Sequence, residues 1–145
     1  MKKATMNTET AIERIKKSAR SMPEVRVIED MKIGQVVRQG DIYIERVAAI
    51  EGRGRILKSR QLAPGTTKGS RHIVGESEGV IICESKPSLK GKAAFQVGPA
   101  IEAKAGSDVV VSHPEHAWIK IKNLVAGFYQ VFFQADYARK NRTQD

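Results

Sequence analysis

The chain is short of the residues that most often carry chemistry. Its 145 residues include one cysteine, one tryptophan and three histidines. Cys83 lies inside the apolar run GVIICES, so we expect a small buried hydrophobic side chain there and not a nucleophile. No apolar run approaches the roughly 20 residues that span a bilayer, and the N-terminus lacks the apolar stretch of a secretory signal. These absences predict a soluble protein made inside a cell, with no membrane partner.

Positive charge is plentiful, and it is concentrated in two segments. The formal net charge is +9. Residues 1–22 carry six Lys or Arg against two Glu, and residues 53–72 carry six basic residues and no acid. Two basic segments on a nearly neutral body attract polyanions, whether nucleic acid, an acidic protein surface or the inside of a DNA-filled particle. The candidate contacts for nucleic acid or another polyanion are Arg53, Arg55, Lys58, Arg60, Lys68 and Arg71.

Residues 1–22 form a basic arm that differs from the rest of the chain. Thr10 and Glu13 have the spacing of a capping box, and Pro23 ends the run. The pattern between them predicts a short amphipathic helix, which needs a surface to pack on. That surface is either the protein's own β-domain, residues 23–145, or a partner subunit; the remaining alternative is that the segment is a frayed tail. The apolar stripe that would dock consists of Ile12, Ile15, Ala19 and Met22.

After Pro23 the hydrophobic pattern changes to alternation with a period of two. Short runs rich in β-branched residues are separated by Gly, Pro, Ser and Asn turn signals, with no helical segment between them. This pattern predicts a mainly β protein, an antiparallel β-sandwich or a small barrel. The expected strands lie within residues 24–30, 40–50, 55–63, 71–75, 79–85, 93–98, 100–106, 107–113, 117–123 and 127–137.

The last two of these segments read as one hairpin, turning near residues 123–127. Ile119 alternates with Trp118 and Lys120 on the first strand, and the second strand carries aromatic residues on both faces. We expect the second strand to be central and covered on both sides. The alternative is that one of its faces waits for a partner.

The three histidines raise the question of a metal site. His72, His113 and His116 with Glu115 would supply three nitrogens and an oxygen, a set that suits zinc or iron. Against this, His113 and His116 stand three apart across a proline, and such a pair is commonly structural. Ser70 lies near His72 but lacks the surroundings of an activated nucleophile. We therefore expect a non-enzymatic protein with no cofactor, although a metal ion remains an alternative.

Nucleic-acid binding has the charge that it requires and one further feature. Trp118 shares a strand face with Lys120 and Lys122, the combination of stacking aromatic and cation that single-strand binders use. Lysines on an edge strand also serve to discourage aggregation. Both interpretations stay open at this point.

Three stretches resemble a family of small uncharacterised β-rich proteins found in bacterial and phage genomes. They are QGDIYIERV, GTTKGSRHIV and SHPEHAWIKIKNLVAGFYQVFFQADY, and the resemblance covers roughly residues 39–137. The chain departs from the family pattern at Ser70, which replaces a histidine, at Ala117, which replaces a glycine, and at Ala126, which replaces a proline. The matching positions are Gln39, Gly40, Asp41, Gly69, His72, His113, Glu115, His116, Gly127, Tyr129, Val131, Gln134 and Tyr137.

The resemblance implies a context and no activity. Phage and mobile-element genomes are rich in small non-enzymatic accessory and virion proteins. We therefore expect a structural protein that assembles with other protein subunits, most concretely an auxiliary or decoration component of a phage particle. The arm would dock it, and its location would be a virion or the bacterial cytoplasm. The alternatives are a nucleic-acid-binding accessory protein and a cupin-like metal-binding protein.

Overall fold

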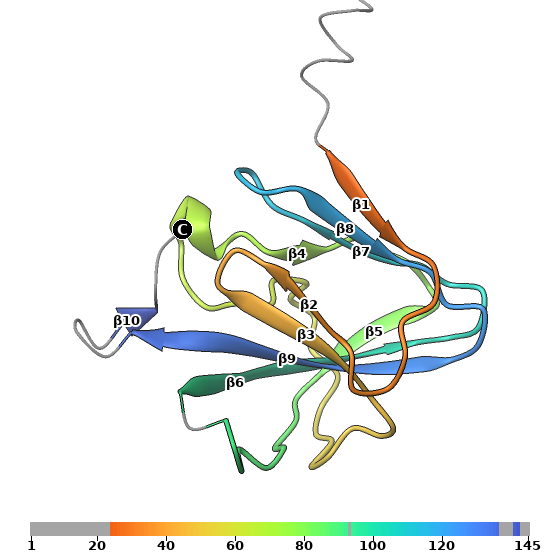
Figure 1. The fold of residues 1–145 in the computed structure, drawn as a ribbon, viewed down its shortest axis with the longest axis horizontal. Helices are drawn as coiled ribbons and strands as arrows, with labels where there is room; N and C mark the ends of the chain where they lie inside the picture. Colours follow the sequence, from red (N-terminus) through yellow and green to blue (C-terminus); the bar gives the residue numbers. More distant parts are fainter. Residues whose placement is uncertain (1–23, 93, 137–140, 143–145) are drawn as a thin grey trace, which may run out of the picture.

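The computed structural model describes residues 24–92, 94–136 and 141–142 as a mainly β protein (Figure 1). The expected N-terminal helix lies outside these residues. One short 3-10 helix, η1 (Lys68–Ser70), interrupts the strands. The strands are β1 (Val25–Ile28), β2 (Val36–Gln39), β3 (Ile42–Val47), β4 (Ile73–Val74), β5 (Val80–Cys83), β6 (Phe95–Ala103), β7 (Val109–Ser112), β8 (Trp118–Ile121), β9 (Gly127–Asp136) and β10 (Asn141–Arg142).

The strands form two sheets. The smaller sheet has four strands in the order β1-β8-β7-β4, and the larger has the order β2-β3-β9-β6-β5 with β10 paired to the end of β9. Neighbouring strands are antiparallel except for β1, which pairs with β8 in parallel, Val25 opposite Trp118. The described strands do not close into a barrel. The mainly β prediction is confirmed, and the all-antiparallel part of it is wrong at this edge.

The core lies between the two sheets, because alternate residues of each strand point to the same interior. The smaller sheet contributes four completely buried side chains, Ile119 and Ile121 of β8 and Val109 and Val111 of β7. From the larger sheet, residues such as Ile42, Ile44, Ile101, Tyr129, Val131 and Phe133 join them in one cluster. Burial of this shared apolar interior is what holds the layers together.

A segment that the sequence predicted to be a strand connects the two sheets along one side of the molecule. Residues 55–63 do not form a continuous strand but make isolated bridges from Ile56 to Cys83 and from Gln61 to Ile73, so they reach from the larger sheet to the smaller. Arg60 secures this crossing, since its guanidinium donates to the carbonyls of Val80 (3.0 Å) and Gly75 (2.8 Å). The guanidinium of Arg60 is therefore engaged in hydrogen bonds within the fold.

The prediction that the last two strand segments, residues 117–123 and 127–137, pair as a hairpin is wrong. β8 belongs to the smaller sheet and β9 to the larger, so the connection between them crosses from one layer to the other. Asn123 holds the crossing: its amide nitrogen donates to the carbonyls of Ser107 (2.9 Å) and Ile121 (3.2 Å), and it accepts a bond from the Tyr129 hydroxyl. A turn signal in sequence specifies a change of direction and not the strand that the chain pairs with next.

The expectation for the last strand itself is confirmed. β9 lies between β3 and β6, and Phe132 and Phe133, which point to opposite faces, are each 5% exposed. The two segments expected at 93–98 and 100–106 are one strand, β6, whose register against β9 shifts between Val97 and Ala100. The side chain of Gln130 fills this irregularity, because its amide donates to the Gly98 carbonyl at 3.0 Å.

Two further expectations concern Cys83 and membrane-spanning segments. Cys83 is completely buried, as predicted, and burial raises the pKa of its thiol, which keeps it protonated and unreactive. No helix in the described part of the chain is long and apolar enough to cross a membrane.

Candidate functional site

The three histidines come together at one end of the molecule, where the β2–β3 turn, η1 and the β7–β8 turn meet (Figure 1). The ring centroids of His72 and His113 are 4.4 Å apart, and those of His113 and His116 are 4.5 Å apart. His72 and His113 are buried, and His116 is partly buried. The rings thus form a stack of three, tilted against one another by 42° and 45°.

Gln39 and Asp41 complete this cluster, although neither was expected from the sequence to be a catalytic or metal-binding residue. They flank Gly40, whose φ of +56° suits a tight turn between β2 and β3. The turn brings both side chains against His72: Nδ1 of the ring is 2.8 Å from Oε1 of Gln39, and Nε2 is 3.1 Å from Oδ1 of Asp41. The sequence feature that pointed to these residues was the Gln-Gly-Asp motif of the family pattern, but the motif did not indicate what they do.

Hydrogen bonding determines how the protons are arranged on His72. The amide nitrogen of Gln39 donates to the carbonyls of Val111 (3.0 Å) and Ala117 (2.9 Å), so its oxygen faces the ring. An amide oxygen only accepts, and Nδ1 of His72 therefore carries a proton. Nε2 of the same ring faces the carboxyl group of Asp41 at 3.1 Å.

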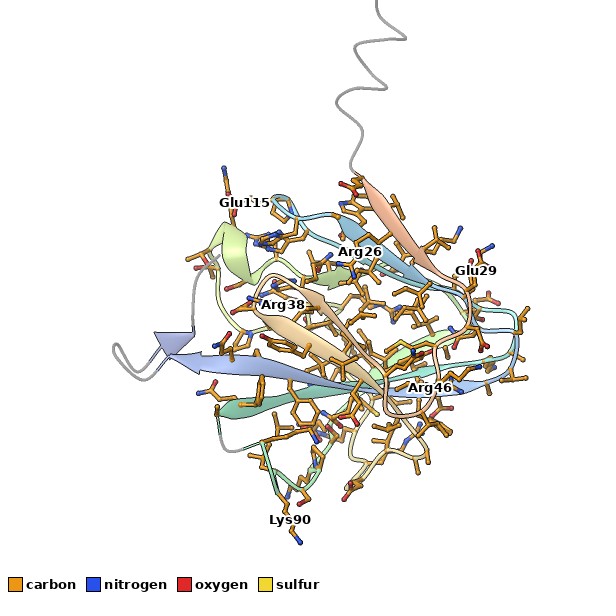
Figure 2. All side chains as sticks on the ribbon, in the orientation of Figure 1. Arg26, Glu29, Arg38, Arg46, Lys90 and Glu115 are labelled. Atoms are coloured by element: carbon orange, nitrogen blue, oxygen red, sulfur yellow. The ribbon has the colours of Figure 1, made fainter. Side chains whose placement is uncertain are left out.

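His113 is held in the neutral form by its own contacts. The backbone N–H of Glu115 donates to Nδ1 (3.0 Å), and Nε2 donates to the carbonyl of Gly69 (3.2 Å). Burial lowers the pKa of His113, and the charges of His72 and His116 lower it further, while the Gly69 bond and the Glu115 carboxylate act in the opposite direction. The Glu115 side chain itself is exposed and points away from the molecule (Figure 2).

These contacts involve the histidines of the metal site considered above. Both ring nitrogens of His72 and both of His113 already have hydrogen-bond partners within the protein. No group of three or more His, Cys, Asp or Glu side chains within residues 24–92, 94–136 and 141–142 is arranged to hold a metal ion. The hydrogen bonds of the cluster join the β2–β3 turn of the larger sheet to η1 and to the smaller sheet.

The six basic residues of the 53–72 segment do not form one patch of free charge. Arg53 is paired with Glu102, Arg55 with Glu84 (3.2 Å), and Arg60 with backbone carbonyls. Lys58, Lys68 and Arg71 are exposed, with no ion-pair partner found within the described part of the chain.

The outer side of the smaller sheet is apolar. Because Ile119, Ile121, Val109 and Val111 point into the core, their neighbours along β7 and β8 point outward. Val25 and Val27 of β1 share this side with Trp118 and Lys120, their register partners, and are 43% and 48% exposed. We call this surface the outer face; it consists of Val25, Val27, Ile73, Val110, Ser112, Trp118 and Lys120.

The outer side of the larger sheet differs from that of the smaller sheet in its burial. Gln130 and Phe132 are buried there, beside a small cavity that Ala49, Pro87 and Ser88 help to line. Lys92 lies 5.4 Å from the ring centroid of Phe132. Figure 1 shows described loops gathered beneath the larger sheet and none above the smaller one. On the outer face Val25 and Val27 are exposed, while Ile73, Val110, Ser112, Trp118 and Lys120 are half-buried.

The structural role of the cluster predicts the effect of Asp41→Ala, which removes the partner of Nε2 of His72. Breaking one partner of a buried, hydrogen-bonded pair typically costs about 3–5 kcal/mol. We expect a loss of that order in the free energy of unfolding, measured by urea denaturation. Asp30→Ala, in the exposed pair with Lys32, is the matched control and should leave the denaturation midpoint unchanged. An equally small effect of both variants would contradict a structural role for the cluster.

The lowered pKa of His113 predicts a dependence of stability on pH. Between the folded pKa and the ordinary value of about 6.5, the unfolded chain binds more protons at this residue than the native protein does. The contribution of His113 is thus complete above about pH 6.5 and is lost as the pH falls through its folded pKa. His113→Gln should flatten the fall in unfolding free energy on acidification. Parallel pH curves for wild type and variant would refute this assignment.

Comparison with known proteins adds a family to this description. The chain matches no curated protein and no solved structure. The model of the family described as "Domain of unknown function (DUF8820)" matches residues 38–134, a range that contains every residue of the histidine cluster. That range is more than half of the chain, and the protein therefore belongs to this uncharacterised family.

Proposed function

We propose that the protein is a non-enzymatic structural component that works by assembling with other protein subunits through the outer face. The observation that carries this proposal is the contrast between the two sheets. On the outer face Val25 and Val27 are exposed beside the half-buried Trp118, whereas on the outer side of the larger sheet Phe132 is buried and Tyr43, Phe95 and Phe128 are half-buried. Open apolar surface of this kind is typical of protein–protein interfaces.

The chemistry of the buried cluster supports the non-enzymatic part of the proposal. A catalytic base needs a ring nitrogen that can reach a substrate. His72 donates from Nδ1 to Gln39 and faces Asp41 with Nε2, while His113 is bonded on both nitrogens. The hydrogen bonds of both rings are made within the protein, and they link the turns of the two sheets.

The specific form that we propose is an auxiliary or decoration component of a phage particle, as the family resemblance to proteins of bacterial and phage genomes suggests. In such a particle many copies are held against one another and against a larger protein lattice. A small, tightly cross-braced β-domain with an open apolar face and a separate basic arm suits this task. Residues Ile12, Ile15, Ala19 and Met22 of the arm would make the docking contacts.

Nucleic-acid binding remains a second candidate, and the exposed Lys58, Lys68 and Arg71 are the observation in its favour. Three phosphate contacts would give a slope of about −2.7 for log K against log salt on duplex DNA. Replacing all three residues by Gln should then remove most of that slope. Absence of measurable binding at low salt would eliminate the candidate.

Metal binding is the weaker alternative. It would require the rings of His72 and His113 to exchange present hydrogen bonds for metal contacts, with His116 and Glu115 completing the set. The metal content of protein purified without chelator decides this alternative, since about one equivalent of zinc or iron per chain would support it.

The proposal predicts that Val27→Glu weakens self-association. Val27 is 48% exposed in the isolated chain, so the change leaves the fold intact, but burial of an unpaired carboxylate in an interface is costly. We expect the concentration at half-association, measured by sedimentation velocity, to rise at least about tenfold, equivalent to about 1.4 kcal/mol.

Leu124→Glu is the matched control for this experiment. Leu124 is 86% exposed and lies in the β8–β9 connection, away from the outer face, so this variant should behave as wild type. Wild-type protein that sediments as a monomer at every concentration would count against assembly through this face.

A further inference from the structure

On the outer side of the larger sheet the fold fixes a buried hydrogen-bond acceptor, the side-chain oxygen of Gln130. This residue is 2% exposed, and its amide nitrogen donates to the carbonyls of Gly98 and Val131, both at 3.0 Å. The reverse orientation would set the amide oxygen against those carbonyls, so only one orientation of the amide is satisfactory. Oε1 is buried, and no hydrogen-bond donor in the described part of the chain reaches it. Because an unpaired buried acceptor is costly, this oxygen needs a further contact.

Gln130 lines a cavity of about 100 Å³ between the larger sheet and the loops that Figure 1 shows beneath it. β9 lies between β3 and β6, and the amide nitrogen of Gln130 is engaged on the β6 side, at Gly98. Oε1 is therefore turned toward β3. There Glu45 stands directly opposite Gln130 in the antiparallel register, so that the two Cβ atoms lie about 5 Å apart on the same face of the sheet. An amide oxygen and a carboxylate thus share one cavity.

Oxygen acceptors outnumber donors among the side chains of this cavity, which we call the Gln130 cavity. Besides Gln130 and Glu45, its polar lining consists of Glu51 and Ser88 from the covering loops and of Lys92. Glu51 is exposed, and it has no ion-pair partner among the residues that the structure describes. Nζ of Lys92 lies 3.7 Å from Oε1 of Glu45, which is too long for a hydrogen bond. With two carboxylates against one ammonium, the lining carries one net negative charge.

The size and chemistry of the Gln130 cavity favour a small, hard cation. At about 30 Å³ for each water molecule, the cavity has room for an ion with a few waters and not for a larger organic cation. The described residues that line it include no His, Cys or Met, and carboxylate, amide and hydroxyl oxygens are the ligands of Ca²⁺ and Mg²⁺. Mg²⁺ demands near-ideal octahedral geometry, whereas Ca²⁺ accepts irregular sets of oxygens. A lining drawn from two strands and two loops therefore suits Ca²⁺ better.

We propose that the Gln130 cavity binds a calcium ion, with Oε1 of Gln130 and the carboxylate of Glu45 as its ligands from the sheet. Glu51 and Ser88 would supply further oxygens from the covering loops. The ion satisfies the buried amide oxygen and ties both loops to the sheet. Because Lys92 competes for Glu45, we expect a weak site, with a Kd on the order of 10⁻⁴–10⁻³ M. The cavity belongs to the larger sheet and not to the outer face, so this inference does not depend on the proposed assembly function.

Calorimetric titration of full-length, metal-free protein with CaCl₂ tests the inference. Glu45→Gln keeps the shape of the side chain and removes its charge, so it should raise the Kd at least about tenfold. Lys92→Gln removes the competing ammonium and should lower the Kd several-fold, which a general loss of structure would not do. Asp108→Asn is the matched control: its carboxylate lies 3.6 Å from Lys120 of the smaller sheet, and this variant should bind calcium as wild type does.

Three results would overturn the calcium site. If the protein shows no binding heat and no rise in unfolding temperature up to about 10 mM CaCl₂, well above the expected Kd, the amide oxygen is satisfied by water alone. A Kd that Glu45→Gln leaves unchanged, or that Lys92→Gln raises, would place bound calcium elsewhere on the protein. Tighter binding of MgCl₂ than of CaCl₂ would contradict the identity of the ion.

Discussion

The side-chain amide of Gln39 is the point on which the arrangement of one end of this protein depends. Its two protons are used by carbonyls of β7 and of the β7–β8 turn, both in the smaller sheet, although Gln39 itself belongs to the larger. This leaves its oxygen facing His72, which is thereby bonded to the β2–β3 turn on both ring nitrogens. This buried amide cannot turn without losing these bonds, so the two layers are fixed against each other there.

The other polar side chains inside the protein follow the same logic. Arg60 joins the two sheets along the side formed by β4 and β5, Asn123 holds the crossing from β8 to β9, and Gln130 fills the irregularity of β6. Residue types that often carry chemistry are therefore engaged in bracing two thin layers. Val25 and Val27 of the outer face, by contrast, are apolar and exposed, which is why the proposed function lies with protein partners on that face.

The sequence predicts some of these features well, for reasons that can be stated for single residues. Strict alternation in β8 placed Ile119 inward and Trp118 outward, because side-chain direction in a strand depends on local geometry alone. The burial of Cys83 and the central place of β9 followed from their apolar surroundings in the same way.

Partners across space were not predictable in this way. The parallel pairing of β1 with β8 and the separation of β8 from β9 depend on which strand edges are free once the layers meet. The bonds between His72 and Gln39 and between His72 and Asp41 join residues more than thirty positions apart, and no local pattern specifies such contacts. The basic segment looked like one polyanion site, but Arg53 and Arg55 found carboxylates on β6 and after β5.

The most direct test of the central claim, that the outer face is an assembly surface, uses the fluorescence of the only tryptophan. Trp118 stands on that face, and its emission reports how much water surrounds the indole. The emission maximum of full-length protein should move to shorter wavelength, and iodide quenching should weaken, as the concentration rises from about 0.1 to about 100 μM. An emission spectrum and a quenching constant that do not change over this whole range would contradict the account.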